Sequence, residues 1–516
     1  MKKPVCLFLI HIVFLVLFCS LFSHARPIPQ TGPDYLKFVL NATEFPPEDY
    51  YDYIVVGGGT TGCPLAATLS QSYRVLLLER GGVTFGKHNL MSQDGFLSTL
   101  NDVDTFDSPA QAFMSEDGVP NARGRVLGGS SAINAGFYSR ADPAFFQQSG
   151  VEWDLDIVNQ AYEWVEEAIV FRPELRNWQS AVRDGLLEAG VEPYTGFSLE
   201  HVVGTKIGGS TFDGSGRRHS AADLLNHANG ANIQVAVYAS VERILLASTS
   251  QYFKVSALLL ISGIGPRSYL SSLGIPVSYH LPYVGQYLYD NPRNGISIVP
   301  PMPLENSLIQ VVGITEAGTY LEAASTVIPF VSPARAVFIR TPSTSPLYLS
   351  VATLMEKIVG PLSTGSLRLA STDVRVNPIV RFNYFSNPVD VERCVNGTRK
   401  IGDVLRSRSM EDFMFREWFG ARNFRYVGPA LPVDLSDFTQ MADFCRRTVS
   451  TIWHYHGGCV MGKVVDRDYH LIGVGAIRVV DGSTLTVSPG TNPQATLMML
   501  GRYLGLKIIR ERKKGH

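Results

Sequence analysis

The feature that most constrains the fold is a glycine-rich turn between two short apolar segments. Residues 53–56 form an apolar run rich in β-branched side chains, which predicts a buried parallel strand. Gly57, Gly59 and Gly62 follow in the spacing GxGxxG, a helical pattern covers residues 64–69, and a second apolar run covers residues 74–78. In this strand–turn–helix–strand context the motif is typical of dinucleotide binding. The sequence therefore predicts a Rossmann-like βαβ unit.

Each glycine of this turn has a physical role. Gly57 permits the tight turn, Gly59 lets a pyrophosphate approach the backbone because it has no Cβ, and Gly62 lets the helix pack closely on the strand. The helix N-terminus offers free N–H groups and a partial positive charge to the phosphates. Glu79 lies 22 residues after Gly57, the spacing of a carboxylate that accepts hydrogen bonds from ribose hydroxyls. The βαβ unit alone does not distinguish FAD binding from NAD binding.

A second glycine-rich turn lies in residues 123–138, RGRVLGGSSAINAGFY. Gly128 and Gly129 precede Ser130 and Ser131 and an apolar segment. Such a turn can form a nest of backbone N–H groups that holds an anion or lies along a flat ring. The alternative is an ordinary helix start capped by serine.

Composition and the two chain ends narrow the function classes. The chain of 516 residues has a formal net charge of −1, and its basic block, residues 510–514, is more typical of a solvated end than of a nucleic-acid site. Lys2 and Lys3 precede an apolar run over residues 5–22 and the pattern Ser23-His24-Ala25. This predicts a secretory signal peptide over residues 1–25, with a membrane anchor as the alternative. We expect no membrane span after cleavage and a secreted protein, extracellular or vacuolar.

Two further features fit a secretory route. Asn41 and Asn396 begin N-glycosylation sequons. Without the signal peptide the chain has four cysteines, which allow three disulfide pairings. Cys63 opens the helix after the glycine turn and Cys459 lies in a glycine-rich motif, so this context favours Cys394 and Cys445 as the pair.

Two motifs near the C-terminus carry groups for acid–base chemistry. The first is WHYHGGCVMG over residues 453–462, and the second is TNPQ over residues 491–494. Neutral imidazole, with a pKa of about 6.5, can accept the proton of an alcohol. The amide of Asn492 cannot exchange protons at this pH, but it can donate a hydrogen bond to an oxygen that gains negative charge. Either His454 or His456 could instead be a structural histidine.

Together, the first turn, the stretch GRVLGGSSAIN over residues 124–134 and the two C-terminal motifs resemble the glucose–methanol–choline (GMC) flavin oxidoreductases. More narrowly they are similar to the plant branch that holds the (R)-mandelonitrile lyases and the HOTHEAD-type proteins. The resemblance runs from about residue 45 to the end and implies FAD as the cofactor. The cofactor-binding residues that it implies are Gly57, Gly59, Thr60, Thr61, Gly62, Glu79, Arg80, Val126, Ser130, Asn134, Ala135, Gly136, Phe137, Val241, Trp453, His454, Asp481, Gly482, Pro493 and Gln494.

The resemblance also implies an α/β fold with two discontinuous parts. A Rossmann-like FAD-binding domain is expected over residues 45–150, 190–292 and 450–516. An α+β substrate domain with a mostly antiparallel sheet is expected over residues 151–189 and 293–449. We expect a monomer, no metal site, and a small-molecule alcohol or cyanohydrin as substrate.

For the chemistry, the resemblance favours His454 as the catalytic base and leaves His456 as the structural candidate. His454 takes the hydroxyl proton of a small aromatic or hydrophobic alcohol, flavin N5 accepts the hydride, and Asn492 donates a hydrogen bond to the oxygen. The alternative is cyanohydrin cleavage, in which FAD is not reduced. By the same resemblance, the lyases of the branch use a pair of histidines and have a tyrosine before the Trp–His pair. This chain has Asn492 in place of the second histidine and Ile452 in place of the tyrosine. Both departures weaken the lyase interpretation.

The sequence departs from the family pattern near residues 250–256. Residues 256–266, SALLLISGIGP, match the back half of a family signature, but its front half and the strands before it are missing. We interpret this as an internal deletion of a few tens of residues. The lost piece would pack beside the first strand and close part of the FAD pocket, so we expect poor folding or weak FAD binding. A catalytically impaired variant is therefore the third hypothesis.

Overall fold

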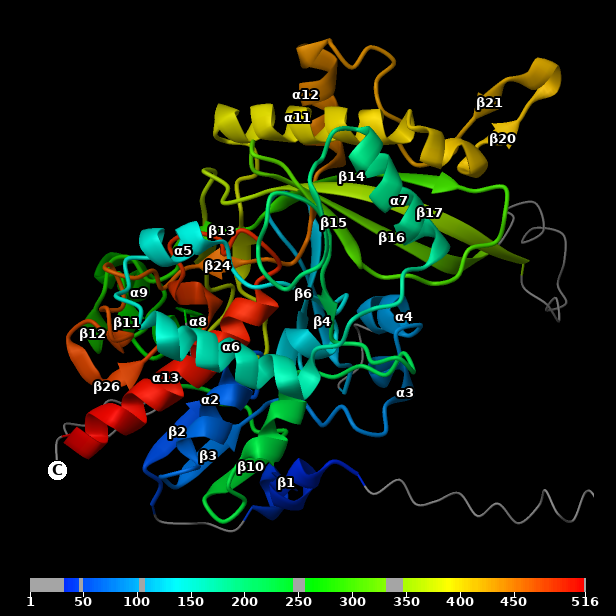
Figure 1. The fold of residues 1–516 in the computed structure, drawn as a ribbon. Coiled ribbons are helices and arrows are strands. Elements are labelled where there is room, and N and C mark those ends of the chain that lie inside the picture. The colour runs from blue at the N-terminus through cyan, green and yellow to red at the C-terminus, as the bar shows by residue number, and fades with distance from the viewer. Residues whose placement is uncertain (1–31, 46–49, 102–106, 245–255, 331–346, 515–516) are drawn as a thin grey trace, which may run out of the picture.

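The computed structural model describes residues 32–45, 50–101, 107–244, 256–330 and 347–514. The expected signal peptide, residues 1–25, and most of the expected deletion junction lie outside these ranges. Figure 1 shows a lower part built on a small parallel sheet and an upper part built on a larger antiparallel sheet with helices above it. This is the predicted α/β fold, with a Rossmann-like part and an α+β part.

The parallel sheet contains the predicted βαβ unit. Its strand order is β1-β10-β3-β2, and each neighbouring pair is parallel. Helix α2 (Gly62–Leu69) joins β2 (Tyr53–Val56) to β3 (Val75–Leu78). The other two strands are β1 (Val39–Asn41) and β10 (Ile233–Val237). Because β1 pairs with β10, the sheet begins before residue 45, the expected start of the domain.

Strand β2 lies at one end of this sheet in the described part of the chain. Tyr53 and Gly57 donate their N–H groups to Arg74 and Leu78 on the β3 side. Since backbone groups alternate along a strand, those of Ile54 and Val56 lie on the side away from β3. Among the described strands none continues the sheet on this side, which is where the sequence predicts the missing segment.

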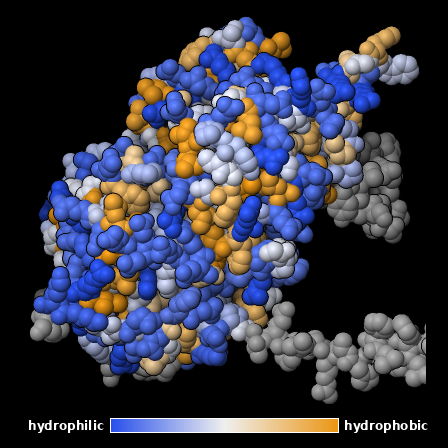
Figure 2. Space-filling view, viewed as in Figure 1, coloured by the Kyte–Doolittle hydropathy of each residue, from blue (hydrophilic) through white to orange (hydrophobic). Residues whose placement is uncertain are grey.

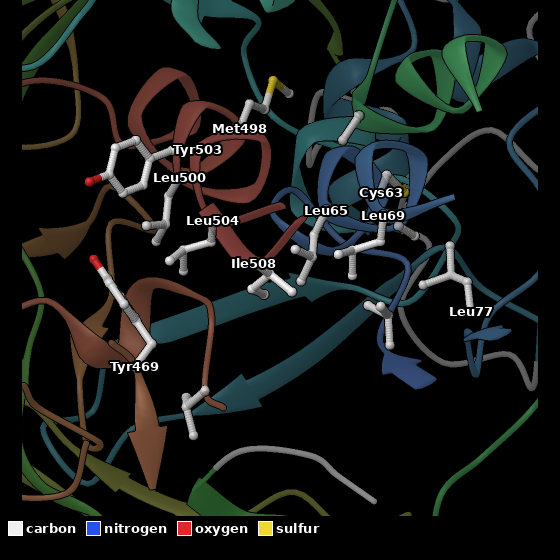
Figure 3. Packing of buried hydrophobic residues seen from close by; sticks show 14 of the residues in the cluster. Cys63, Leu65, Leu69, Leu77, Tyr469, Met498, Leu500, Tyr503, Leu504 and Ile508 are labelled. Atoms are coloured by element: carbon white, nitrogen blue, oxygen red, sulfur yellow. The ribbon is translucent and has the colours of Figure 1, made fainter. Parts of the chain in front are cut away.

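The core of the lower part is packed by the C-terminal helix α13 (Gln494–Lys514) and by α6 (Leu155–Ile169). Figure 3 shows Leu65 and Leu69 of α2 close to Leu504 and Ile508 of α13. A Cβ on Gly501 would lie 2.3 Å from the carbonyl oxygen of Thr61, so this glycine lets α13 approach the start of α2. The helix that follows the TNPQ motif therefore supports the helix that follows the dinucleotide turn.

The upper part is built on an antiparallel sheet, apart from the parallel pair β7–β8. Its path is β22 (Arg425–Val427), β14 (Pro292–Val299), β17 (Leu347–Ile358), β16 (Thr319–Phe330), β15 (Val311–Ile314), β8 (Gly204–Ile207) and β7 (Tyr194–Phe197), and β23 (Ser450–Thr451) pairs with β14.

Helices α11 (Pro388–Leu405) and α12 (Phe438–Thr448) lie above this sheet in Figure 1, and α7 (Asn177–Glu188) packs against it. A disulfide joins Cys394 of α11 to Cys445 of α12, with the two Cα atoms 6.3 Å apart. This is the pairing that the sequence context favours, and Cys63 and Cys459 are free and buried.

Packing divides the chain differently from the expected boundaries at residues 151 and 190. The buried face of α6, including Ile157, Ala161 and Val165, belongs to the core that contains α2 and α13. In contrast, α7 packs on the antiparallel sheet, and β7 and β8 belong to that sheet. Periodicity finds the two helices but does not show which sheet each one covers.

The surface in Figure 2 is mostly hydrophilic with scattered apolar patches. A hairpin of β20 (Phe415–Arg416) and β21 (Arg422–Asn423) projects from the upper part, and Trp418 at its tip is 91% exposed. Among the described helices, none combines the length and the apolar composition that a membrane span requires.

Candidate active site

A cavity of about 1740 Å³ brings together most of the residues predicted from sequence. It extends from the dinucleotide turn to the antiparallel sheet. The predicted residues that line it are Gly57, Gly59, Thr60, Thr61, Gly62, Glu79, Arg80, Ser130, Asn134, Ala135, Gly136, Phe137, Val241, Trp453, His454, Asp481, Gly482, Asn492, Pro493 and Gln494. Val126 is the exception: it is buried beside Gly82 and does not reach the cavity. It packs instead in a small apolar cluster with Leu90, Ala110, Ala132 and Ile133.

The first glycine turn has the shape that a pyrophosphate requires. Gly57 has a φ of 103°, which favours glycine, and a Cβ on Gly62 would lie 1.9 Å from the carbonyl oxygen of Gly57. A Cβ on Gly59 would meet no atom within 4 Å, so this backbone faces open space in the cavity. The N-terminus of α2 begins directly after it. The chain therefore offers free backbone and a helix N-terminus at the same place.

The second glycine turn lies against the first. The N–H of Gly128 donates to the carbonyl oxygen of Gly58 at 2.6 Å. Gly129 has a φ of 58°, and a Cβ there would lie 2.7 Å from the Cα of Gly59. The two motifs, far apart in sequence, thus form one wall of the cavity.

This wall is tied to the C-terminal motif by side-chain amides. Asn134 donates from Nδ2 to Oε1 of Gln494 at 2.9 Å, and Gln494 donates from Nε2 to the carbonyl oxygen of Phe137 at 2.6 Å. At the other end, Glu79 is buried and accepts the N–H of Gly81 at 2.8 Å through one carboxylate oxygen. Glu79 lines the cavity, and a carboxylate after the second strand of such a unit can accept hydrogen bonds from ribose hydroxyls.

His454 is held at the cavity by its backbone. The segment before β24 (His456–Gly457) passes Asp290, whose Oδ1 accepts the N–H of His454 at 3.0 Å. The imidazole is 8% exposed, and its Nδ1 has no hydrogen-bond partner among the described residues. Burial, with smaller electrostatic contributions from Lys357, His456 and Arg293, holds the pKa of His454 well below its usual range. The ring is therefore neutral at physiological pH.

His456 has a different environment. Its ring stacks on Tyr289 with centroids 5.1 Å apart, and its Nδ1 lies 3.1 Å from the carbonyl oxygen of His454. Burial lowers the pKa of His456 to about 4. These contacts are those of a histidine that supports the motif, although its side chain also lines the cavity.

Asn492 lines the same cavity and contacts a buried ion pair. Its Oδ1 accepts a hydrogen bond from Nζ of Lys357 at 2.7 Å, and the same ammonium donates to Oε1 of Glu322 at 2.9 Å. Lys357 and Glu322 are each 1% exposed. Arg293 also lines the cavity, with its guanidinium 5.3 Å from the ring centroid of Trp453.

Sequence reasoning missed Lys357, Glu322 and Arg293, which lie on β17, β16 and β14. The available signal was a charged residue within an otherwise apolar strand, as in Met355-Glu356-Lys357-Ile358. A charge inside a buried strand requires a partner, so such positions point to a functional or structural ion pair.

The fold and the cavity define a dinucleotide-dependent enzyme. The chain belongs to the GMC oxidoreductase family: the family's N-terminal model matches residues 51–257 and its C-terminal model matches residues 361–501. FAD is the cofactor, and the two glycine turns, Glu79 and the free backbone at Gly59 fit it. The match of the N-terminal model ends beside the expected deletion junction.

Curated relatives include both lyases and an oxidase. The chain is 66% identical to "(R)-mandelonitrile lyase-like" of Arabidopsis thaliana, over 95% of this chain and 96% of that protein. It is 45% identical to "(R)-mandelonitrile lyase 1" of Prunus serotina, over 98% and 95% of the two chains. It is 47% identical to "Sinalpyl alcohol oxidase Nec3" of Nesocodon mauritianus, over 93% and 92%.

Among solved structures, a formate oxidase has a TM-score of 0.74 at 19% identity and covers 92% of this chain and 100% of its own. This likeness shows the fold. The alignment with the Arabidopsis relative spans 528 positions, whereas 95% of 516 residues is about 490. The difference is what an internal gap of a few tens of residues in this chain produces.

Proposed function

We propose that this protein is an FAD-dependent oxidoreductase that acts on the CH–OH group of a small aromatic or hydrophobic alcohol. The observation that carries the proposal is that His454 and Asn492 line the cavity that begins at the dinucleotide turn. FAD, when bound, supplies the acceptor for the hydride that leaves the alcohol carbon. The remaining chemistry falls to side chains of this chain.

His454 is the proposed catalytic base. Because its ring is buried and neutral, it can accept the hydroxyl proton of the alcohol without first losing a proton of its own. Asn492 is the proposed donor to the substrate oxygen, whose negative charge grows as that proton leaves. Trp453, Met355 and Ile309 line the cavity as well, which supports an apolar substrate.

We assign the cofactor contacts to the residues that share this cavity. The turn from Gly57 to Gly62 binds the pyrophosphate, Glu79 binds the ribose, and Val241 lies at the adenine end. The run Asn134–Phe137 and the segments around Asp481 and Pro493 contact the remainder of FAD. The hydrogen bond between Asn134 and Gln494 supports this assignment because it fixes two of these segments to each other.

A second candidate function is cyanohydrin cleavage. Arg293, which is half-buried and lines the cavity, supports it, since a cation favours departure of an anion. In this reaction the base takes the hydroxyl proton and cyanide leaves, with no change in the oxidation state of FAD. Asn492 and Ile452, where the lyase pattern has histidine and tyrosine, argue for the oxidoreductase.

Anaerobic mixing separates the two functions. The protein, saturated with FAD, is mixed with benzyl alcohol and related alcohols, and then with mandelonitrile. Bleaching of the flavin by an alcohol is the expected result. Cyanide release from mandelonitrile without bleaching would show the lyase instead, and the absence of both would support the impaired variant.

We also propose that the chain enters the secretory pathway as a monomer, loses residues 1–25 and is glycosylated at Asn41 and Asn396. Asn396 is exposed on α11, but Thr398 of the same sequon is buried and donates to the carbonyl oxygen of Cys394. Glycan transfer at Asn396 must therefore precede folding. The mass lost on enzymatic removal of N-glycans from secreted protein tests both sites.

A further inference from the structure

We propose that Lys357 is a positioning residue that fixes the amide of Asn492 with its N–H groups toward the cavity. The inference rests on the proposed function, in which Asn492 donates to the substrate oxygen. Asn492 lines the cavity, whereas Lys357 lies behind it and does not. Lys357 can therefore affect a ligand only through its contact with Asn492 or through the electrostatic effect of its own ammonium group.

The hydrogen bonds decide the orientation of the amide. An ammonium group has three donors and no acceptor. Nζ of Lys357 lies 2.7 Å from Oδ1 of Asn492, and a flipped amide would place an N–H group against the ammonium. The oxygen of Asn492 must therefore face β17, and Nδ2 is turned to the other side. Among the described residues none accepts a hydrogen bond from Nδ2, so the amide can donate to a ligand in the cavity that Asn492 lines.

Two contacts besides that with Asn492 hold Lys357 in place. Glu322 accepts from Nζ at 2.9 Å, and the ring of Tyr320 lies 4.0 Å from Nζ. Tyr320 is the direct cross-strand partner of Lys357 in the β16–β17 pair. The hydroxyl of Tyr320 also lies 3.1 Å from Oγ1 of Thr491, the residue before Asn492. The ion pair and the loop that carries the amide are thus fixed to the same strands.

This arrangement determines which ligands the site accepts. Without Lys357, rotation about the last side-chain bond would let Asn492 present either its oxygen or its nitrogen to the cavity. With Lys357, Asn492 presents donors alone, so the site recognises an acceptor such as an alkoxide or a carbonyl oxygen. Burial is the main cause of the lowered pKa of His454, and the positive charge of Lys357 lowers it further.

The test uses acetophenone, a neutral ketone whose oxygen accepts hydrogen bonds and which has no alcohol to oxidise. Its affinity for FAD-saturated protein is measured by calorimetry for wild type, Lys357→Met, Asn492→Ala and the double variant. Each single change is expected to weaken binding about 3- to 10-fold, the range of one neutral hydrogen bond. The double variant is expected to bind no more weakly than Asn492→Ala, because Lys357 acts through Asn492.

Three further variants separate positioning from stability. Lys357→Met leaves Glu322 buried without its partner, so Lys357→Met with Glu322→Gln is measured beside Glu322→Gln alone. Lys357→Arg keeps the charge and the donors and is expected to restore most of the affinity. In the pH profile of alcohol oxidation, Lys357→Met is expected to move the acidic limb to higher pH because His454 loses a neighbouring positive charge.

Several results would overturn the inference. One is a Lys357→Met variant, folded and loaded with FAD, that binds acetophenone as wild type does. Another is a double variant whose loss equals the product of the two single losses. If wild type does not bind acetophenone, the proposed substrate class is wrong. A crystal structure then decides the inference, which is wrong if Lys357 Nζ lies beyond about 3.5 Å from Asn492 Oδ1.

Discussion

Asp290 accepts the backbone N–H of His454 at 3.0 Å. The second oxygen of this buried carboxylate accepts from the hydroxyls of Tyr384 at 2.5 Å and Thr451 at 2.7 Å. Burial raises the pKa of Asp290 to about 6, although the three donors favour its charged form. One carboxylate therefore anchors the segment that carries the proposed base.

Replacing this anchor tests its role. Asp290→Asn replaces one carboxylate oxygen with an NH₂ group, which cannot accept a hydrogen bond. At least one of the three buried donors to Asp290 then loses its acceptor, at a cost of about 1–3 kcal/mol. We expect a lower free energy of unfolding in urea and a lower turnover number. Tyr384→Phe, which removes one donor and leaves the carboxylate intact, is the matched control with a cost of about 1 kcal/mol. Equal effects of the two changes would show that Asp290 is not the anchor.

His454 should determine the rate without being required for cofactor binding. His454→Gln is expected to lower kcat/KM for the alcohol by about 10²- to 10⁴-fold, the usual contribution of a general base, while the FAD content is unchanged. Because the pKa of His454 lies well below its usual range, the wild-type profile should stay flat through pH 6.5 and fall only at lower pH. His88→Gln, at an exposed histidine, is the control. A wild-type profile that falls near pH 6.5 would contradict a buried neutral base.

Two glycines of the first turn should respond differently to alanine. Gly62→Ala places a methyl group against the carbonyl oxygen of Gly57, so we expect a lower melting temperature of the apoprotein. Gly59→Ala meets no atom within 4 Å, so the melting temperature should be unchanged while FAD binding weakens. Thermal melts and quenching of flavin fluorescence measure the two effects. Wild-type FAD affinity in Gly59→Ala would contradict the proposed pyrophosphate site.

Glu356 should make stability depend on pH. Its carboxyl is buried between β17 and α11, and neither oxygen has a hydrogen-bond partner among the described residues. Burial raises the pKa of Glu356 well above its usual range, so the folded state keeps the proton that the unfolded state loses near pH 4.3. The free energy of unfolding must therefore fall as the pH rises from there toward the folded-state pKa.

Glu356→Gln keeps the neutral shape and should remove this dependence. We expect the variant to be more stable than wild type at pH 8 and nearly equal to it at pH 4, by urea unfolding. Glu163→Gln, at an exposed position on α6, is the control. It should leave the pH dependence of the free energy of unfolding as it is in wild type. If the free energy of unfolding of Glu356→Gln depends on pH as that of wild type does, the Glu356 carboxyl is ionised in the folded protein.

The open edge of the parallel sheet predicts weak cofactor binding. The cavity extends along Ile54 and Val56 of β2, on the side where the sheet has no further strand in the described residues. Inserting the extra residues of the Arabidopsis relative after residue 250 should raise both the melting temperature and the FAD affinity. An insertion of equal length rich in glycine and serine is the control. Stoichiometric FAD on the purified natural chain would contradict this prediction.

The sequence by itself determined the features that depend on a few neighbouring residues. Glycine spacing fixes the backbone of the first turn, and the His and Asn motifs contain the proposed base and hydrogen-bond donor. Their assembly into one cavity agrees with the family resemblance, because Gly57, His454 and Asn492 all line it. The cysteine context also gave the observed Cys394–Cys445 pair.

Only the tertiary structure decided which strand and helix faces meet. Side chains alternate between the two faces of a strand, so Glu356 and Lys357 are neighbours in sequence but lie on opposite faces of β17. Which of them meets Asn492 depends on how the antiparallel sheet lies over the cavity. In the same way, the contacts of α6 with α13 depend on packing between segments that are distant in sequence. Such packing also decides that Val126 does not line the cavity.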